Sequence, residues 1–366
     1  MPKDVIVYTK LDSKPRPAEA MNILALLTDG AVEPKVYRDT DELLDDGYAP
    51  ESQIYTQVCA FFNQGKTTKA KKLIRKIKVA GVNVESNDPE DLITAIVGLR
   101  EQDDDWDFIV TDRTDKASIV ALCEWAESTE PTRAELGAGI EDHRKFYFFQ
   151  AGIGTVFAGG GSVVTLKITN RRCAGIVAAD LEEQTEAAFI GNVGPHYPFS
   201  ATWKFNRPQG ITLPDLTAAQ REALEEANLN FLTEEYKREY VKNGVCCDGE
   251  FIDNQMGADY ITRYMREKLY DVYLRAERKV PYSDEGFAMV AGAVYETLNR
   301  AVDLGIISKD PESGMGKYIV NVPARADATD DQARRREMPP IEWHAEFEGA
   351  VHNSEADGTL YATLPA

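Results

Sequence analysis

The chain has 366 residues, a formal net charge of −20 at pH 7 and 43% hydrophobic residues. Its length suits two domains with a sizeable core. Its negative charge argues against nucleic acid as a partner, because phosphate groups would be repelled. No apolar run is long enough to cross a bilayer, and the N-terminal residues lack the form of a signal peptide. We therefore expect a protein that folds in a cytoplasm and has no direct membrane insertion.

The cysteines and histidines form no pattern typical of a metal site. The five cysteines are scattered without CxxC spacing, and the adjacent pair Cys246-Cys247 suits neither a disulfide nor a shared metal ion. The four histidines show neither HxH nor HExxH spacing. We expect free or buried thiols, and we predict no catalytic residue, no cofactor and no metal.

The N-terminal residues predict a strand that has no nearby partner. Residues 5–9 form a β-rich run, and Pro15 and Pro17 make the following segment stiff and extended. Such a strand either folds back or pairs with another chain.

From about residue 26 to residue 200, apolar strands alternate with amphipathic helices, which is typical of a layered α/β domain. Asp88 with Pro89 is a typical helix start. The expected strands are 21–28, 71–81, 107–113, 144–152 and 163–169, and the expected helices are 51–62, 88–102 and 115–129.

Long helices predominate in the second half. Thr217 and Ser283 are the expected N-caps of two of them, and Gly305 is the expected end of the second. The expected helices are 216–240, 258–278 and 283–305, with a short helix at 327–337, and the expected strands are 317–324, 341–353 and 358–364.

Two Gly-containing segments resemble nucleotide-binding loops. Gly65-Lys66-Thr67 has the end of a P-loop motif, but Ala60 stands where the first glycine is needed, and a helical pattern precedes it instead of a strand. We interpret Gly65 as the end of that helix, with a P-loop NTPase as the alternative. The Gly-rich segment 152–161 has Phe157 where a dinucleotide motif needs glycine, so we expect a surface loop.

Taken in order, several segments resemble contractile tail sheath proteins, the family that forms the outer cylinder of myophage tails and of R-type phage-tail-like bacteriocins. They are FFNQG at 61–65, TWKFNRPQGIT at 202–212, KVPYSDEG at 279–286, and GAVH at 349–352 followed by one more β-run. The resemblance covers almost the whole chain, although 66–200 is matched only by the order of its elements. It explains neither the Gly-rich segment nor the cysteine pair.

The resemblance implies a mixed α+β fold in four parts: an N-terminal extended arm (1–20), an outer α/β domain (21–205), an inner domain of long helices and a small sheet (206–354), and a C-terminal extended arm (355–366). Strands from neighbouring subunits are expected to complete the small sheet. The residues expected to form the donated strands are Val5, Ile6, Val7, Tyr8, Thr359, Leu360, Tyr361 and Thr363.

The resemblance also implies a structural subunit without enzymatic activity. Such a subunit polymerises with itself as a helical cylinder around an inner tail tube protein and meets baseplate and tail terminator proteins. It contracts from a metastable extended state to drive the tube through a target envelope, and new subunit contacts supply the free energy. The expected location is a virion tail or a phage-tail-like particle, assembled in the host bacterial cytoplasm.

Arg334, Arg335 and Arg336 end the short helix at 327–337 and form a basic cluster in an acidic chain. We expect them to contact an acidic inner tube. The alternative is a set of salt bridges within the helix, with Asp327, Asp330 and Asp331 as partners.

Overall fold

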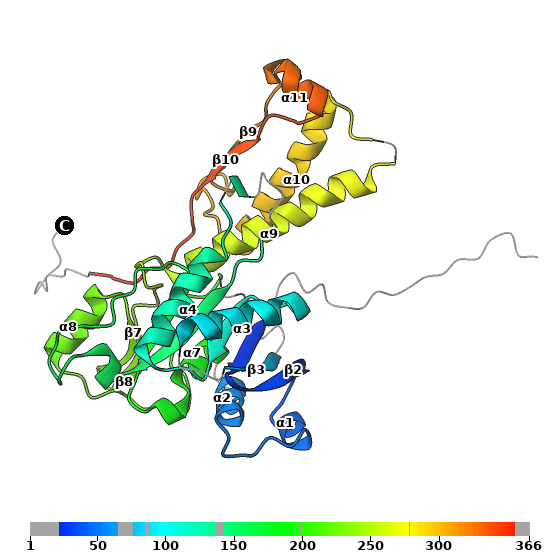
Figure 1. Ribbon diagram of the computed structural model, residues 1–366. Helices are drawn as coiled ribbons and strands as arrows, with labels where there is room; N and C mark the ends of the chain where they lie inside the picture. The colour runs from blue at the N-terminus through cyan, green and yellow to red at the C-terminus, as the bar shows by residue number, and fades with distance from the viewer. Residues whose placement is uncertain are drawn as a thin grey trace, which may run out of the picture.

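The computed structural model describes residues 22–64, 76–84, 88–132, 134–135, 142–195, 197, 199–277 and 279–355. The mixed α and β fold predicted from the sequence is confirmed. Figure 1 shows a layered body, residues 22–251, from which two long helices and a small sheet project as a stalk, residues 252–345.

The body is built on one sheet of eight strands in the order β2-β3-β1-β4-β5-β6-β7-β8. Six neighbouring strands are parallel, and β2 and β8 close the two ends as antiparallel strands. The strands are β1 (Ile23–Leu27), β2 (Asp29–Tyr37), β3 (Ile77–Asn83), β4 (Phe108–Thr111), β5 (Phe146–Gly152), β6 (Cys173–Ala178), β7 (Asn230–Glu235) and β8 (Arg238–Lys242).

Alternating side chains of the sheet supply two separate cores. In β5, Phe146 and Phe148 face one core, and Tyr147 and Phe149 face the other. Helices α2 (Gln53–Phe62) and α7 (Thr185–Val193) cover the first face. Helices α3 (Pro89–Gln102) and α4 (Lys116–Ser128) cover the second. A parallel sheet needs such cover on both faces, which explains why its strands read as continuous apolar runs.

The predicted N-caps Asp88 and Thr217 are confirmed, whereas the helix predicted to begin at residue 258 begins at Ile252. Asp88 accepts a hydrogen bond from the backbone N–H of Glu90, and Thr217 with Gln220 forms a capping box. The body helices are α1 (Asp41–Asp45), α2 (Gln53–Phe62), α3 (Pro89–Gln102), α4 (Lys116–Ser128), α6 (Ile153–Val156), α7 (Thr185–Val193) and α8 (Ala218–Glu226), with a 3₁₀ turn at Leu181–Glu183.

The stalk consists of two long helices that pack on each other, a two-stranded sheet and a short helix (Figure 1). Ser283 caps the second helix, and Gly305 follows its end with φ +74°, both as predicted. The elements are α9 (Ile252–Arg275), α10 (Asp284–Asp303), β9 (Tyr318–Asn321), a 3₁₀ turn at Arg325–Asp327, α11 (Asp330–Arg335) and β10 (Glu342–Ala345).

The prediction of one long helix over residues 216–240 is wrong. Helix α8 ends at Glu226, and Asn228 adopts a left-handed φ of 57° before the hairpin β7–β8 begins. The turn residues Tyr236 and Lys237 also have positive φ, which their residue types do not indicate. Pairing of β7 with β6 outweighs the helical propensity of this charged segment. The sheet consequently continues past residue 205, where we expected the outer domain to end.

Two predicted strands are shorter in the structure. Residues 163–169 form only a bridge between Val164 and Phe157, and this bridge closes the exposed Gly-rich loop. The strand predicted at 341–353 is regular only over β10, and beyond it Phe347 makes a single bridge to Ile307.

Several predictions fall outside the described residues: the donated strands at 5–9 and 358–364 and the P-loop candidate Gly65-Lys66-Thr67. In the part of the chain that the structure describes, every helix is too short or too polar to cross a membrane.

Candidate assembly surfaces

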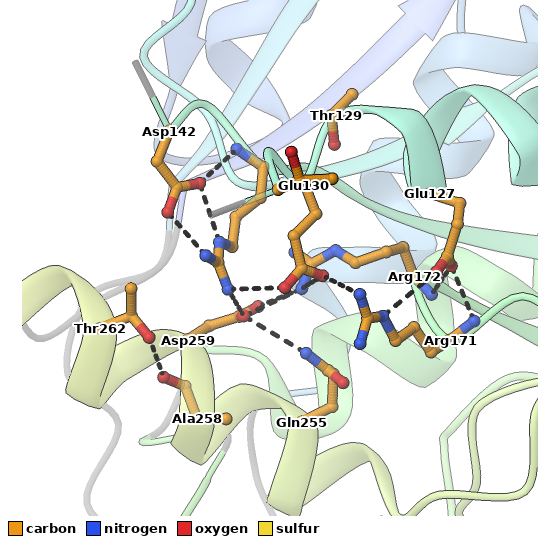
Figure 2. A network of polar contacts seen from close by, with 12 residues as sticks. Glu127, Thr129, Glu130, Asp142, Arg171, Arg172, Gln255, Ala258, Asp259 and Thr262 are labelled. Carbon is orange, nitrogen blue, oxygen red and sulfur yellow. Dashed lines mark hydrogen bonds and ion pairs between the residues drawn. The ribbon is translucent and has the colours of Figure 1, made fainter. Parts of the chain in front are cut away.

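A network of charged side chains joins the base of the stalk to the body (Figure 2). Asp259 on α9 accepts hydrogen bonds from Arg172 Nη1 at 2.8 and 2.9 Å and from Arg144 Nη1 at 3.1 Å. Arg172 is almost fully buried and also donates to the carbonyl of Lys145 at 2.9 Å. Because a buried cation is tolerated only when it is paired, these bonds fix the position of α9 against the sheet.

Further along α9, two arginines extend the same connection. Arg263 lies 3.2 Å from Asp107, and Arg266 donates to Asp142 at 2.8 Å. Burial alone would raise the pKa of Asp142, but hydrogen bonds from Arg144 and Arg266 lower it to about 2. Ionic contacts therefore continue outward over two turns of α9 beyond the buried pair.

Beyond this network, the stalk carries a small sheet with two unpaired edges. Strands β9 and β10 are antiparallel, with Trp343 opposite Val320, and among the described residues they pair with each other only. On one face Tyr318, Val320 and Trp343 pack against the helices, whereas Ile319 on the other face is 65% exposed. Four-residue strands in a two-stranded sheet are marginally stable alone, and their open edges can accept further strands.

A groove of about 530 Å³ lies between α9 and β10. Met265, Leu269 and Tyr273 line it from the helix, and Trp343 lines it from the strand. Tyr273 is 55% exposed, and Leu274 next to it is 79% exposed. The groove and these side chains form an apolar surface beside an open sheet edge.

The predicted basic cluster lies on the surface of α11. Arg335 pairs with Asp331 one turn earlier, whereas the carboxylate of Asp327 accepts from the backbone N–H of Ala324 at 2.8 Å. Arg334 and Arg336 are exposed. One of the three arginines therefore forms the salt bridge within the helix that the alternative interpretation predicts. The cluster as a whole faces solvent.

The position where open α/β sheets bind ligands is occupied by the chain's own side chains. That position lies beyond the carboxyl ends of β1 and β4, where the strand order reverses. Arg113 Nε donates to Thr28 Oγ1 at 2.6 Å, and the Thr28 N–H donates to Asp112 at 3.0 Å. These contacts give the site a structural role in the body.

The sequence analysis did not single out the charged network. Asp259 is the one signal that was available, because it lies on the apolar side of α9 between Met256 and Tyr260, both of which are buried. A carboxylate at such a position needs a cation, but the sequence does not say that Arg172 and Arg144, from distant segments, supply it.

A family model matches the C-terminal part of the chain. Residues 252–357 match the family model described as E217 tail sheath protein gp31-like, C-terminal domain. No curated protein matches the chain. The matched range contains the whole stalk.

Solved structures extend the likeness of fold to nearly the whole chain. The helical sheath of the anti-feeding prophage in its contracted state is 13% identical with a TM-score of 0.65, covering 96% of this chain and 98% of that one. The contracted sheath complex of the extracellular contractile injection system PVC is 13% identical with a TM-score of 0.60, at 96% and 98% coverage. The sheath tail protein Lin1278 from Listeria innocua is 11% identical with a TM-score of 0.55, at 82% and 88% coverage. The resemblance to contractile tail sheath proteins inferred from the sequence is confirmed.

Proposed function

We propose that this chain, with the fold of contractile sheath proteins and a C-terminal tail sheath domain, is a structural subunit of a contractile tail sheath. It polymerises as a helical cylinder around an inner tube, and it contracts from a metastable extended state to drive that tube through an envelope. The observation that carries this proposal is the β9–β10 sheet, whose two edges are left open by the described part of the chain and lie beside an apolar groove.

Strands from neighbouring copies complete the small sheet. Residues 5–8 and residues 359–361 with Thr363 are the donated strands, and each brings backbone hydrogen bonds with a net contribution of about 0.5–1.5 kcal/mol apiece. A strand on the free edge of β10 would lie next to the groove lined by Leu269 and Tyr273. Such links hold subunits together while their larger faces change partners.

Removal of either strand tests this link. Deletion of residues 1–15, or of residues 356–366, should give monomers that retain the folded body, whereas the full chain forms large polymers as its concentration rises. Analytical ultracentrifugation measures the assembly, and circular dichroism checks the fold. Truncated chains that polymerise as well as the full chain would contradict strand donation.

Arg334, Arg335 and Arg336 contact the inner tube. The support is an exposed basic cluster on the stalk of a chain with net charge −20, which fits an acidic tube surface. Replacing all three with serine should reduce co-assembly with tube protein, most strongly at low salt, because exposed charges act over about 10 Å at 0.1 M salt. Normal sheath assembly on tubes by this variant would refute the contact.

The remaining parts of the proposal follow from the same role. The subunit has no enzymatic activity, meets baseplate and tail terminator proteins at the cylinder ends, and is assembled in the host bacterial cytoplasm without nucleic acid. The sheet body lies outside and the stalk lies inside the cylinder. The alternative P-loop NTPase predicts nucleotide binding that Lys66→Ala abolishes, and an absence of ATP and GTP binding by calorimetry excludes it.

A further inference from the structure

Three cysteines that are far apart in the sequence meet inside the body. Cys123 comes from α4, Cys173 begins β6, and Cys247 follows β8; all three have no exposed surface. The side chains of all three belong to the core on one face of the sheet. Among the described residues, no three histidine, cysteine or carboxylate groups are arranged to hold a metal ion.

The backbone favours one pair within this cluster. The N–H of Cys247 donates to the carbonyl of Cys173 at 3.0 Å. A disulfide requires Cα atoms about 4.4–6.8 Å apart, and this hydrogen bond holds the two backbones side by side. Cys123 approaches from α4 in the helix layer above the sheet, and among the described residues no backbone hydrogen bond joins it to Cys173.

The neighbouring Cys246 is an internal control. It is also fully buried, but its side chain belongs to the core on the opposite face of the sheet, whereas Cys247 belongs to the core that contains Cys173. The adjacent pair noted in the sequence therefore consists of two thiols with different surroundings.

We propose that Cys173 and Cys247 are a latent disulfide pair, reduced when the chain folds and joined when a peroxide-class oxidant reaches them. Peroxide converts one thiol to a sulfenic acid with release of water, and the second thiol displaces a further water as the S–S bond forms. The two thiols lose two electrons and two protons, and the peroxide is reduced to two waters.

The bond would tie β6 to the segment that follows β8. It would close a loop of about 75 residues, which favours the folded state by restricting the unfolded chain. Burial, and then the contact with Cys123, raises the pKa of Cys173 well above its usual value, so the reaction is slow and requires local opening of the body. This inference does not depend on the proposed sheath function.

The test treats the full chain with hydrogen peroxide, alkylates remaining thiols in denaturant and maps linked peptides by mass spectrometry without reduction. Because Cys246 and Cys247 fall in one peptide, the variants C246S and C247S assign the bond. We expect C246S to keep the link to Cys173 and C247S to lose it, and we expect oxidation to raise the Tm by about 5 °C or more in a way that dithiothreitol reverses.

Three results would overturn the proposal: a link between Cys123 and Cys173, a link that C246S removes, or no link in folded protein under conditions that oxidise the denatured chain. If C247S does not fold, C247A replaces it. The peptide maps of the wild type and of C246S still show whether Cys173 is linked to Cys247, to Cys246 or to Cys123.

Discussion

The sheets of the body and of the stalk differ in how many of their faces are covered. The eight-stranded sheet of the body is covered by helices on both faces and ends in antiparallel edge strands. The two-stranded sheet of the stalk is covered on one face, and large exposed apolar residues gather around it, including Leu274 and Ile319. The sheet of the body is therefore covered within the chain, whereas the stalk exposes an apolar surface of the kind that marks interaction sites.

The charged network at the base of α9 makes these two unlike parts one unit. A body with its own core and a projecting stalk could otherwise pivot at residue 252. The buried pair of Asp259 and Arg172 opposes such movement, because separating the charges would leave both in a low-dielectric environment.

The largest effect is expected at this junction. Asp259→Asn should lower the free energy of unfolding by about 3–5 kcal/mol, because it leaves the buried Arg172 and the nearby Arg144 without their shared carboxylate. Urea unfolding at pH 7 measures the change. The matched control is Asp271→Asn in the outer half of α9, which breaks a more exposed pair with Arg275 and should cost less than about 1 kcal/mol. Equal effects of the two variants would mean that the junction is not locked by charge.

A second large effect is expected inside the body, at Glu186. This carboxyl group is fully buried against Gln57, whose Nε2 donates to it at 2.8 Å, and burial raises its pKa to about 7. The folded state therefore keeps a proton that the unfolded chain releases near its ordinary pKa of 4.5. Between these values stability falls as pH rises, by on the order of 3 kcal/mol over the whole window.

Glu186→Gln should remove this dependence. We expect the variant to be more stable than the wild type at pH 8 and to differ little at pH 5, as measured by thermal unfolding across this range. Glu182→Gln, at an exposed position of the preceding turn, is the control and should leave the profile unchanged. A parallel pH profile for Glu186→Gln and the wild type would show that the buried group does not titrate as described.

The smallest effect on folding, paired with a clear effect on assembly, is expected in the stalk groove. Tyr273→Ser should change the free energy of unfolding by less than about 0.5 kcal/mol, because the ring is half exposed. It should raise the concentration needed for polymerisation by about tenfold, as loss of an aromatic anchor does. Tyr236→Ser, at the 98% exposed hairpin tip of the body, is the contrast and should leave assembly unchanged. Light scattering measures polymerisation of both variants. A larger loss of polymerisation with Tyr236→Ser than with Tyr273→Ser would contradict the assignment of the assembly surface to the stalk.

The sequence predicted the elements whose signals are local. Asp88, Thr217 and Ser283 indicated helix starts, and the apolar run 23–27 indicated a buried strand, because capping and burial depend on nearby residues. The hairpin at 230–242 was missed because its strands exist through pairing with β6, a contact between residues more than 50 positions apart. The network around Asp259 was missed for the same reason, since its three segments meet only in the folded chain.

The central claim is that this chain forms a contractile cylinder through its stalk, and electron microscopy of the full-length protein tests it most directly. The account predicts striated cylinders that occur in two lengths when the chain is produced with its tube protein, and none when residues 356–366 are removed. Single particles of monomer size at every concentration, with or without the tube protein, would contradict it.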